Sequence, residues 1–387
     1  MSSPLTAILG ASLLVTALAV TPLAAASAGP LSSPADPVYP YHFLQDVDAV
    51  SSSDVWAVGG DQQADGGTES YAEHFDGSRW RHVRTPPDVA DFLQGVSAAS
   101  SSDVWAVGTF DDGRVNPYAL HWDGIAWSKV LTADPGQPYS LDAVDALASD
   151  DVWAVGGVAA GSGAKALVEH WDGSAWSVVD TPVVDDAVST SLSGVEAIGA
   201  DDVWAVGPSY GAVGSQDPAA TIMHWDGAQW SIVPSHAGTH VTLTAVSATA
   251  GDDVWAVGSR GVGHGDSVTV TEHWDGSRWG VVDSPNGSGP VSTLSGVEAV
   301  APDDAWAVGA TRLAHLKGGP SRQSEVPLFE HWDGATWSIV DRLSKDRYSY
   351  LAAVSAVSSS DIWSVGGRRT STSYQDLKLH WNGQRWR

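Results

Sequence analysis

The chain has 387 residues and no cysteine, and 46 acidic against 19 basic residues leave a formal net charge of −27. The absence of cysteine excludes disulfides and a lipid-modified amino terminus, so core packing and chain topology must supply the stability. The negative charge argues against nucleic-acid binding, which needs cations facing the phosphates. It favours a soluble, self-repelling surface.

Residues 1–28 have the features of a secretory signal peptide. An apolar stretch over residues 5–23 is followed by the small-residue cleavage pattern Ala26-Ser27-Ala28. No Lys or Arg precedes the stretch, so an uncleaved membrane anchor is the alternative, but Pro22 interrupts the stretch and no basic flank follows it. We expect cleavage after Ala28 and a secreted, extracellular protein without membrane insertion, since no second apolar run of spanning length follows.

Residues 29–42 form a leader before the repeats. The last repeat stops at Trp386-Arg387, where the other repeats continue into a further strand. Alignment of the first two repeat starts places the segment around residues 31–35 where that outer strand belongs, and we predict that it closes the last repeat. The alternative is a frayed last repeat and a disordered leader, which Pro30, Pro34 and Pro37 permit.

Residues 43–387 repeat two phrases seven times. The first, Asp-Val-Trp-Ala-Val-Gly or a close variant, starts at Asp54, Asp103, Asp151, Asp202, Asp253, Asp304 and Asp361. The second, His-Trp-Asp-Gly-x-x-Trp or a close variant, starts at His74, His121, His170, His224, His273, His331 and His380. The spacing of 48 to 57 residues is near that of propeller blades. All 20 tryptophans lie in these phrases, which core packing explains.

Each repeat predicts four antiparallel strands. A short first strand such as Leu93–Ala98 precedes the Val-Trp-Ala-Val strand, whose unbroken apolar run indicates cover on both faces. The third strand ends at His-Trp, an Asp-Gly two-residue hairpin turn follows, and the fourth strand begins at the closing Trp.

The polar residues of the two phrases are expected to be structural. The last repeat has Asn382-Gly383 in place of Asp-Gly, so turn geometry explains this aspartate better than metal binding or catalysis. Because the second and third strands are antiparallel, each repeated His should lie near the Asp that opens the second strand. We predict a hydrogen bond between them.

These phrases resemble those of secreted bacterial repeat proteins of the DVWAVG and HWDG type, and more remotely those of kelch and WD40 propellers. The resemblance implies an all-β fold: a seven-bladed β-propeller with four antiparallel strands per blade, over residues 43–387. Propellers include lectins, lyases, oxidases, glycosidases and scaffolds, so the resemblance does not imply one function.

Connection lengths distinguish two faces of the expected propeller. Every repeat has the same spacing across its first-to-second and third-to-fourth turns, which share one face, here the standard face. From the Gly that ends the second strand to the His, the separations are 15, 13, 14, 17, 15, 22 and 14 residues. These connections share the other face, here the variable face, where ligand-binding residues are expected.

A basic sector is predicted on the variable face of repeats six and seven. Nine cations there, including Lys378, oppose only four carboxylates. The candidate ligand-binding residues are Arg312, Lys317, Arg322, Arg342, Lys345, Arg347, Arg368 and Arg369, with Tyr348, Tyr350 and Tyr374. We expect an anionic ligand, since Arg suits bidentate contact with carboxylate or phosphate. The alternative is neutralisation of the acidic chain itself.

The sequence therefore favours a monomeric extracellular binding propeller that recognises a glycan or an anionic cell-envelope polymer. A polysaccharide-active lyase or hydrolase and a protein-interaction scaffold are the alternatives. No residue set selects a catalytic mechanism, and no cofactor is implied. Acidic segments such as Asp61, Asp65 and Glu69 lack the spacing of a calcium loop.

Overall fold

The computed structural model describes residues 41–62, 67–87, 92–111, 115–211, 218–313, 324–340, 348–370 and 374–387. This part of the chain contains strands β1 to β28 and no helix. The predicted signal peptide and the proposed closing strand at residues 31–35 lie outside it.

The strands follow the sequence repeats, which we number one to seven. The first strands are β1 (Tyr41–Ser51), β5 (Phe92–Ser100), β9 (Tyr139–Ala148), β13 (Ser189–Thr190) with β14 (Gly194–Gly199), β18 (Val241–Ala250), β22 (Val291–Ala301) and β26 (Ser349–Ser358). The second strands are β2 (Asp54–Gln62), β6 (Asp103–Asp111), β10 (Asp151–Ala160), β15 (Asp202–Tyr210), β19 (Asp253–Gly263), β23 (Asp304–Leu313) and β27 (Asp361–Arg369).

The outer strands are shorter toward the rim. The third strands are β3 (Thr68–Phe75), β7 (Val115–Trp122), β11 (Gly163–Trp171), β16 (Pro218–Trp225), β20 (Asp266–Trp274), β24 (Ser324–Trp332) and β28 (Tyr374–Trp381). The fourth strands of repeats one to six are β4 (Trp80–His82), β8 (Trp127–Val130), β12 (Trp176–Val179), β17 (Trp230–Ile232), β21 (Trp279–Val282) and β25 (Trp337–Ile339). In repeat seven, Trp386 forms a bridge with Trp381 at the equivalent place.

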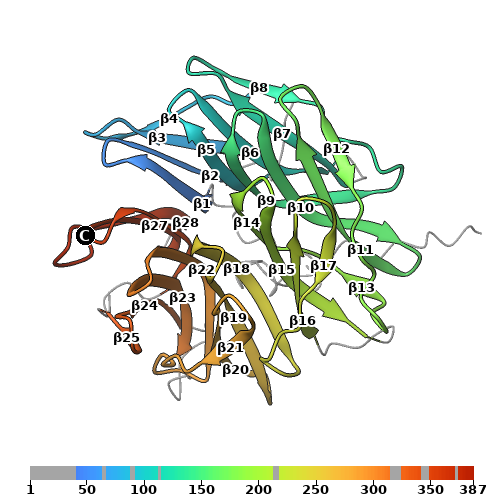
Figure 1. Ribbon diagram of the computed structural model, residues 1–387. Helices are drawn as coiled ribbons and strands as arrows, with labels where there is room; N and C mark the ends of the chain where they lie inside the picture. The colour runs from blue at the N-terminus through green and yellow to red at the C-terminus, as the bar shows by residue number, and fades with distance from the viewer. Residues whose placement is uncertain are drawn as a thin grey trace, which may run out of the picture.

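Within each repeat the strands pair antiparallel in the order first, second, third, fourth. Figure 1 shows the repeats arranged around an axis, with β1, β14, β18 and β22 near the centre and β8, β12 and β25 toward the rim. The second strand is covered on both faces: in repeat two, Val104, Ala106 and Val107 are fully buried and Trp105 nearly so. This confirms the expectation drawn from the unbroken apolar run.

Tryptophans join each repeat to the next. The Trp56 ring of β2 lies 4.9 Å from that of Trp122 and 5.3 Å from that of Trp127, centroid to centroid. Corresponding contacts start from Trp105, Trp153, Trp204, Trp255 and Trp306. Trp363 of repeat seven contacts Phe75 and Trp80 of repeat one, so the series closes on itself.

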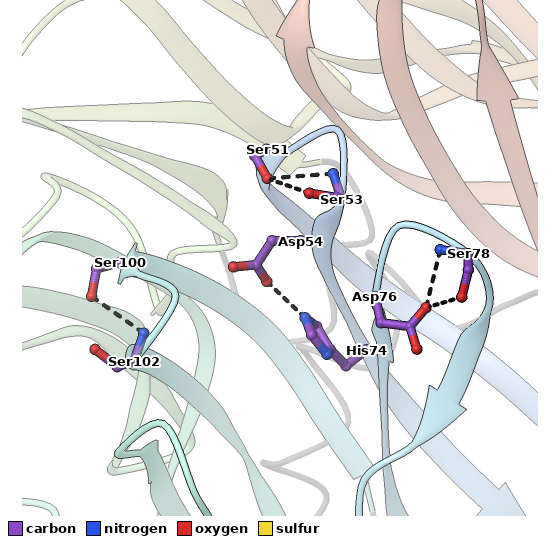
Figure 2. Close-up of polar contacts among 8 residues, drawn as sticks. All are labelled: Ser51, Ser53, Asp54, His74, Asp76, Ser78, Ser100 and Ser102. Atoms are coloured by element: carbon purple, nitrogen blue, oxygen red, sulfur yellow. Dashed lines mark hydrogen bonds and ion pairs between the residues drawn. The ribbon is translucent and has the colours of Figure 1, made fainter.

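The predicted tie between histidine and aspartate is confirmed in all seven repeats. In repeat one His74 Nε2 lies 2.7 Å from Asp54 Oδ1, as Figure 2 shows. The ties elsewhere are His121–Asp103, His170–Asp151, His224–Asp202, His273–Asp253, His331–Asp304 and His380–Asp361. Each joins the second strand to the third beside the standard face.

The predicted two-residue Asp-Gly turn is wrong in its length. The loop has four residues: in repeat three Trp171 pairs with Trp176, and Asp172 N donates to Ala175 O at 3.4 Å. The Asp172 carboxylate accepts from Ser174 Oγ and the backbone N of Ser174 and Ala175, bonds that lower its pKa to about 2. Figure 2 shows the same arrangement for Asp76 and Ser78. Asn382 accepts equivalent backbone bonds in repeat seven, which supports the structural interpretation.

Candidate functional site

The structure brings part of the predicted basic sector together at the variable-face ends of β23, β24, β26, β27 and β28. Tyr348 N donates to Glu325 O at 2.7 Å, and Arg369 N donates to Tyr348 O at 2.8 Å. Arg369 is in register with Tyr374 across β27 and β28. These contacts place Tyr348 between repeats six and seven and connect it to Arg369 and Tyr374.

Arg368 and Arg369 are the exposed cations of this cluster among the described residues. The Arg369 guanidinium carbon lies 5.5 Å from the centroid of the Tyr374 ring, a cation–π distance. Arg368 donates to Gln375 Oε1 at 3.2 Å and remains exposed. The Tyr350 ring lies against Gly367, where a Cβ atom would come within 2.8 Å of the phenol oxygen.

Tyr348 has a strained backbone. Its φ is 73°, in the left-handed region that bulky residues rarely adopt. The two backbone bonds to Glu325 and Arg369 hold this conformation. Strain of this kind costs on the order of 1–3 kcal/mol and is concentrated at functional sites, which makes Tyr348 a candidate residue of this cluster.

Two predicted patch cations are not free for a ligand. The Arg312 side chain is only 16% exposed, and its Nε lies 3.8 Å from Glu325 Oε1. Lys378 Nζ contacts Glu73 of repeat one, lies 2.5 Å from Asp376 Oδ2 and lies 5.4 Å from the centroid of the Trp80 ring, a cation–π distance. Both sit in the sheets, where burial and nearby carboxylates favour internal pairing. These two cations are therefore paired within the chain. The other predicted cations, Lys317, Arg322, Arg342, Lys345 and Arg347, lie outside the described residues.

A second candidate, absent from the sequence-based list, is a cavity on the axis. It has a volume of about 160 Å³ and is lined by the first strands of all seven repeats. Its polar lining includes Gln45, Asp46, Gln94, Asp142, Ser193 and Thr244. Its described lining residues include no Lys, Arg or His.

Beside this cavity a ring of side-chain acceptors, here the inner belt, links neighbouring repeats. Each belt residue stands between Val and Ala in a first strand and accepts a bond from the Ala N of the next repeat; Asp48, for example, accepts from Ala98 at 2.7 Å. The belt consists of Asp48, Ser97, Asp145, Glu196, Ser247, Glu298 and Ser355. Ser355 accepts from Ala49, which completes the circle. The sequence signal was the polar residue inside each Val-x-Ala phrase.

Burial raises the pKa of the carboxyls around the axis. Desolvation is the largest cause for each, and it brings the pKa of Asp46 and Asp142 to about 7, that of Asp48 to about 6 and that of Glu298 to about 8. The pKa values of Asp145 and Glu196 are raised in the same way. Asp46 and Asp142 keep some exposed area, and both line the partly open cavity on the axis, where the surrounding strands limit their contact with solvent.

The belt bonds give the carboxyls of Asp48, Asp145, Glu196 and Glu298 a structural role. They satisfy backbone N–H groups on the inner edges of the first strands, which would otherwise be unpaired in the interior. Within the described ranges, no three His, Asp or Glu side chains are placed to hold a metal ion. The same residues include no helix long and apolar enough to cross a membrane.

No protein-family model matches this sequence, and no curated protein matches it by sequence. Solved structures do match the fold. The chain is similar to YCF48 bound to a D1 peptide, with 15% identity, a TM-score of 0.53 and coverage of 90% of this chain and 98% of that one. It is also similar to the β-propeller domain of the trilobed protease from Pyrococcus furiosus, with 12% identity, a TM-score of 0.52 and coverage of 90% and 97%.

A third similar structure is the GH74 xyloglucanase from Xanthomonas campestris, with 13% identity, a TM-score of 0.53 and coverage of 88% of this chain and 54% of that one. At these identities the likeness concerns the fold alone. The strands, their radial arrangement and these matches establish that the chain is an all-β protein with a β-propeller fold.

Proposed function

We propose that this protein is a secreted, seven-bladed binding propeller that recognises an anionic polysaccharide through its variable face. Each repeat would form one blade of four strands, with residues 31–35 completing the last blade. The proposed location follows from the signal-peptide features of residues 1–28.

The observation that carries the binding proposal is the cluster of Arg368, Arg369 and Tyr374 beside the strained Tyr348. Two exposed guanidinium groups belong to a chain of net charge −27, and one of them lies over the Tyr374 ring, an aromatic side chain of the type on which sugars stack. Arginine can hold the carboxylates of a uronic acid polymer in bidentate fashion. The cluster lies at strand ends on the face where connection lengths vary, as binding sites commonly do.

Binding of polygalacturonate tests this proposal. The double variant Arg368→Glu/Arg369→Glu should weaken binding by about tenfold or more, since the loss of roughly 1.4 kcal/mol suffices for a factor of ten. Affinity of the unaltered protein should fall as salt rises. The matched control is Arg79→Glu/Arg278→Glu, which makes the same charge change at exposed positions of the standard face and should leave binding intact.

Two results would contradict the proposal: no binding of polygalacturonate by the unaltered protein, or equal loss in both double variants. Polyphosphate serves as a second probe, because preferential binding of it would indicate a phosphate polymer instead. A product assay on any bound polysaccharide separates binding from turnover.

A further inference from the structure

The position directly before the histidine of each third strand faces the preceding repeat. It is Glu73, Glu169, Glu272 or Glu330 in four repeats and Leu120, Met223 or Leu379 in the other three. Three of the glutamates are bonded across the seam between repeats. Glu73 contacts Lys378, Glu169 accepts from Ala133 N at 3.0 Å, and Glu272 accepts from Ser235 Oγ and His236 N.

Glu330 is the fourth, and it has no hydrogen-bond or ion-pair partner among the described residues. The residue is fully buried, and neither carboxyl oxygen has a hydrogen-bond partner. Leu328, two residues earlier on the same face of β24, packs with Val257 of repeat five, so Glu330 faces that seam. In the sheet it stands in register with Ala307 and Ile339, which offer no side-chain donor.

The missing partner has a local cause. The backbone donors Ala133 and His236 lie six residues after the Trp that opens the fourth strand, and repeat five has Pro285 at this place. Proline has no N–H to donate.

The side chains nearby are also committed. Ser284, which corresponds to Ser235, donates to Thr269 Oγ1 at 2.8 Å. Thr271, which corresponds to Lys378, donates to Val282 O at 2.6 Å. Neither hydroxyl therefore serves the Glu330 carboxyl.

The other described seams follow a matching rule that Glu330 breaks. Pro86 and Pro182 occupy the Pro285 position in repeats one and three, and the next repeats then have Leu120 and Met223. Ala133 and His236 are followed by Glu169 and Glu272. Where the earlier repeat has proline at this position, the next repeat has an apolar residue before its histidine. Where the earlier repeat has a residue with a backbone N–H, the next repeat has a glutamate. Glu330 is the exception, because it follows a repeat that has proline at this position.

We propose that protonation of Glu330 controls the packing between repeats five and six. The two repeats pack tightly while the carboxyl is neutral, and their packing weakens when it ionises. A buried charge without a partner costs far more than a buried neutral acid, so the tightly packed seam selects the protonated form. Burial alone accounts for the rise in the pKa of Glu330 to about 8, and no charged group contributes to it. The residues that face Glu330, which are Ala307, Ile339 and Thr271, have no titratable side chain. Asp283, which directly follows β21, is exposed to solvent.

The pH window follows from this rise. The unfolded carboxyl ionises near its ordinary pKa of 4.5, while the folded one keeps its proton up to about 8. Stability is fully present below the lower pKa and is lost as pH rises toward the upper one. Within this window each pH unit costs up to about tenfold in the folding equilibrium constant.

The test compares the variant Glu330→Leu with the unaltered protein from pH 5 to 10. This variant reproduces the natural combination of Pro86 in repeat one with Leu120 in repeat two. Glu330→Leu should unfold at a higher temperature, with a difference that grows as pH rises to about 8. Hydrogen exchange at β24 and β25 should be slower in the variant above this pH. The comparison at each pH cancels the intrinsic pH dependence of exchange.

Glu330→Gln is the second variant, and it should also lose this part of the pH dependence without requiring apolar repacking. Glu272→Gln is the matched control and should lower stability, because Ser235 and His236 lose a charged acceptor. Superimposable pH profiles for the unaltered protein and both Glu330 variants would overturn the proposal. So would destabilisation by both variants across the whole pH range.

Discussion

Trp363 of repeat seven lies edge-on to Trp80 of repeat one, with ring centroids 5.6 Å apart and ring planes at 81°. The same edge-on contact recurs at the other six seams, as between Trp204 and Trp279. Trp80 is only half-buried, whereas its counterparts are buried, and Phe75 stands beside it where the other repeats have Trp. The closing seam therefore buries less indole than the rest of the ring.

Replacing Phe75 by Trp should stabilise the protein. The counterpart Trp171 donates its indole N–H to Ser149 O at 3.2 Å, a bond that Phe75 cannot make. We expect a gain of about 0.5–1.5 kcal/mol from this bond, with further burial adding to it. Thermal unfolding measures it, and Trp171→Phe should show the opposite sign. A lower midpoint for Phe75→Trp would mean that the closing seam has no room for an indole.

The histidine–aspartate ties should each contribute modestly to stability. His170→Leu removes the 2.8 Å bond to Asp151 and leaves a half-buried carboxylate without this partner. Urea unfolding should show a loss of about 1–3 kcal/mol, because the bond involves a charged acceptor. The control is His82→Leu, since His82 is exposed and makes no such tie. Equal effects of the two changes would contradict the assignment.

The inner belt predicts a pH-dependent contribution at Glu298. Its folded pKa of about 8 lies above the ordinary 4.5, so stability is present below 4.5 and is lost as pH rises toward 8. Glu298→Gln keeps an oxygen for the Ala356 N–H and removes the titration, so its stability should fall less over this range. Calorimetry at pH 5 and pH 8 measures the difference, and parallel losses in both proteins would contradict it.

Belt position Ser247 provides a test of the acceptor role without any charge. Ser247→Ala leaves the Ala299 N–H without its 3.1 Å bond. An unsatisfied buried donor costs about 1–3 kcal/mol, which equilibrium unfolding will detect. Ser247→Asp should retain the bond, as Asp145 does with Ala197. A neutral Ser247→Ala change would show that the belt bonds do not hold the repeats together.

The turns on the standard face should not tolerate a side chain at glycine. Gly227 has a φ of 86°, and a Cβ there would lie 2.8 Å from Asp201 Cβ. Gly227→Ala should therefore cost at least about 1 kcal/mol through strain and crowding. Gly211 is the control, because a Cβ at this residue meets nothing within 4 Å. Equal stability of the two alanine variants would rule out the strain argument.

Much of the fold was readable from the repeats because local chemistry repeats with them. Antiparallel pairing and the spacing of His74 and Asp54 predicted their bond, and the apolar run around Trp105 predicted a doubly covered strand. The turn length was missed because the Asp172 carboxylate accepts from the backbone N of Ser174 and Ala175, and this lengthens the loop. The candidate site was predicted less well, since charge counting along the chain cannot show that Glu325 and Glu73 neutralise Arg312 and Lys378.

The sequence by itself determined the number of repeats, the order of the strands and which residues enter the core, because these depend on short-range periodicity. Only the tertiary structure decided which residues meet across the seams. The belt carboxyls, the contact of Trp363 with Trp80 and the unpartnered Glu330 all depend on neighbours from other repeats. Their protonation and stability follow from desolvation in that environment, which no local pattern of residues specifies.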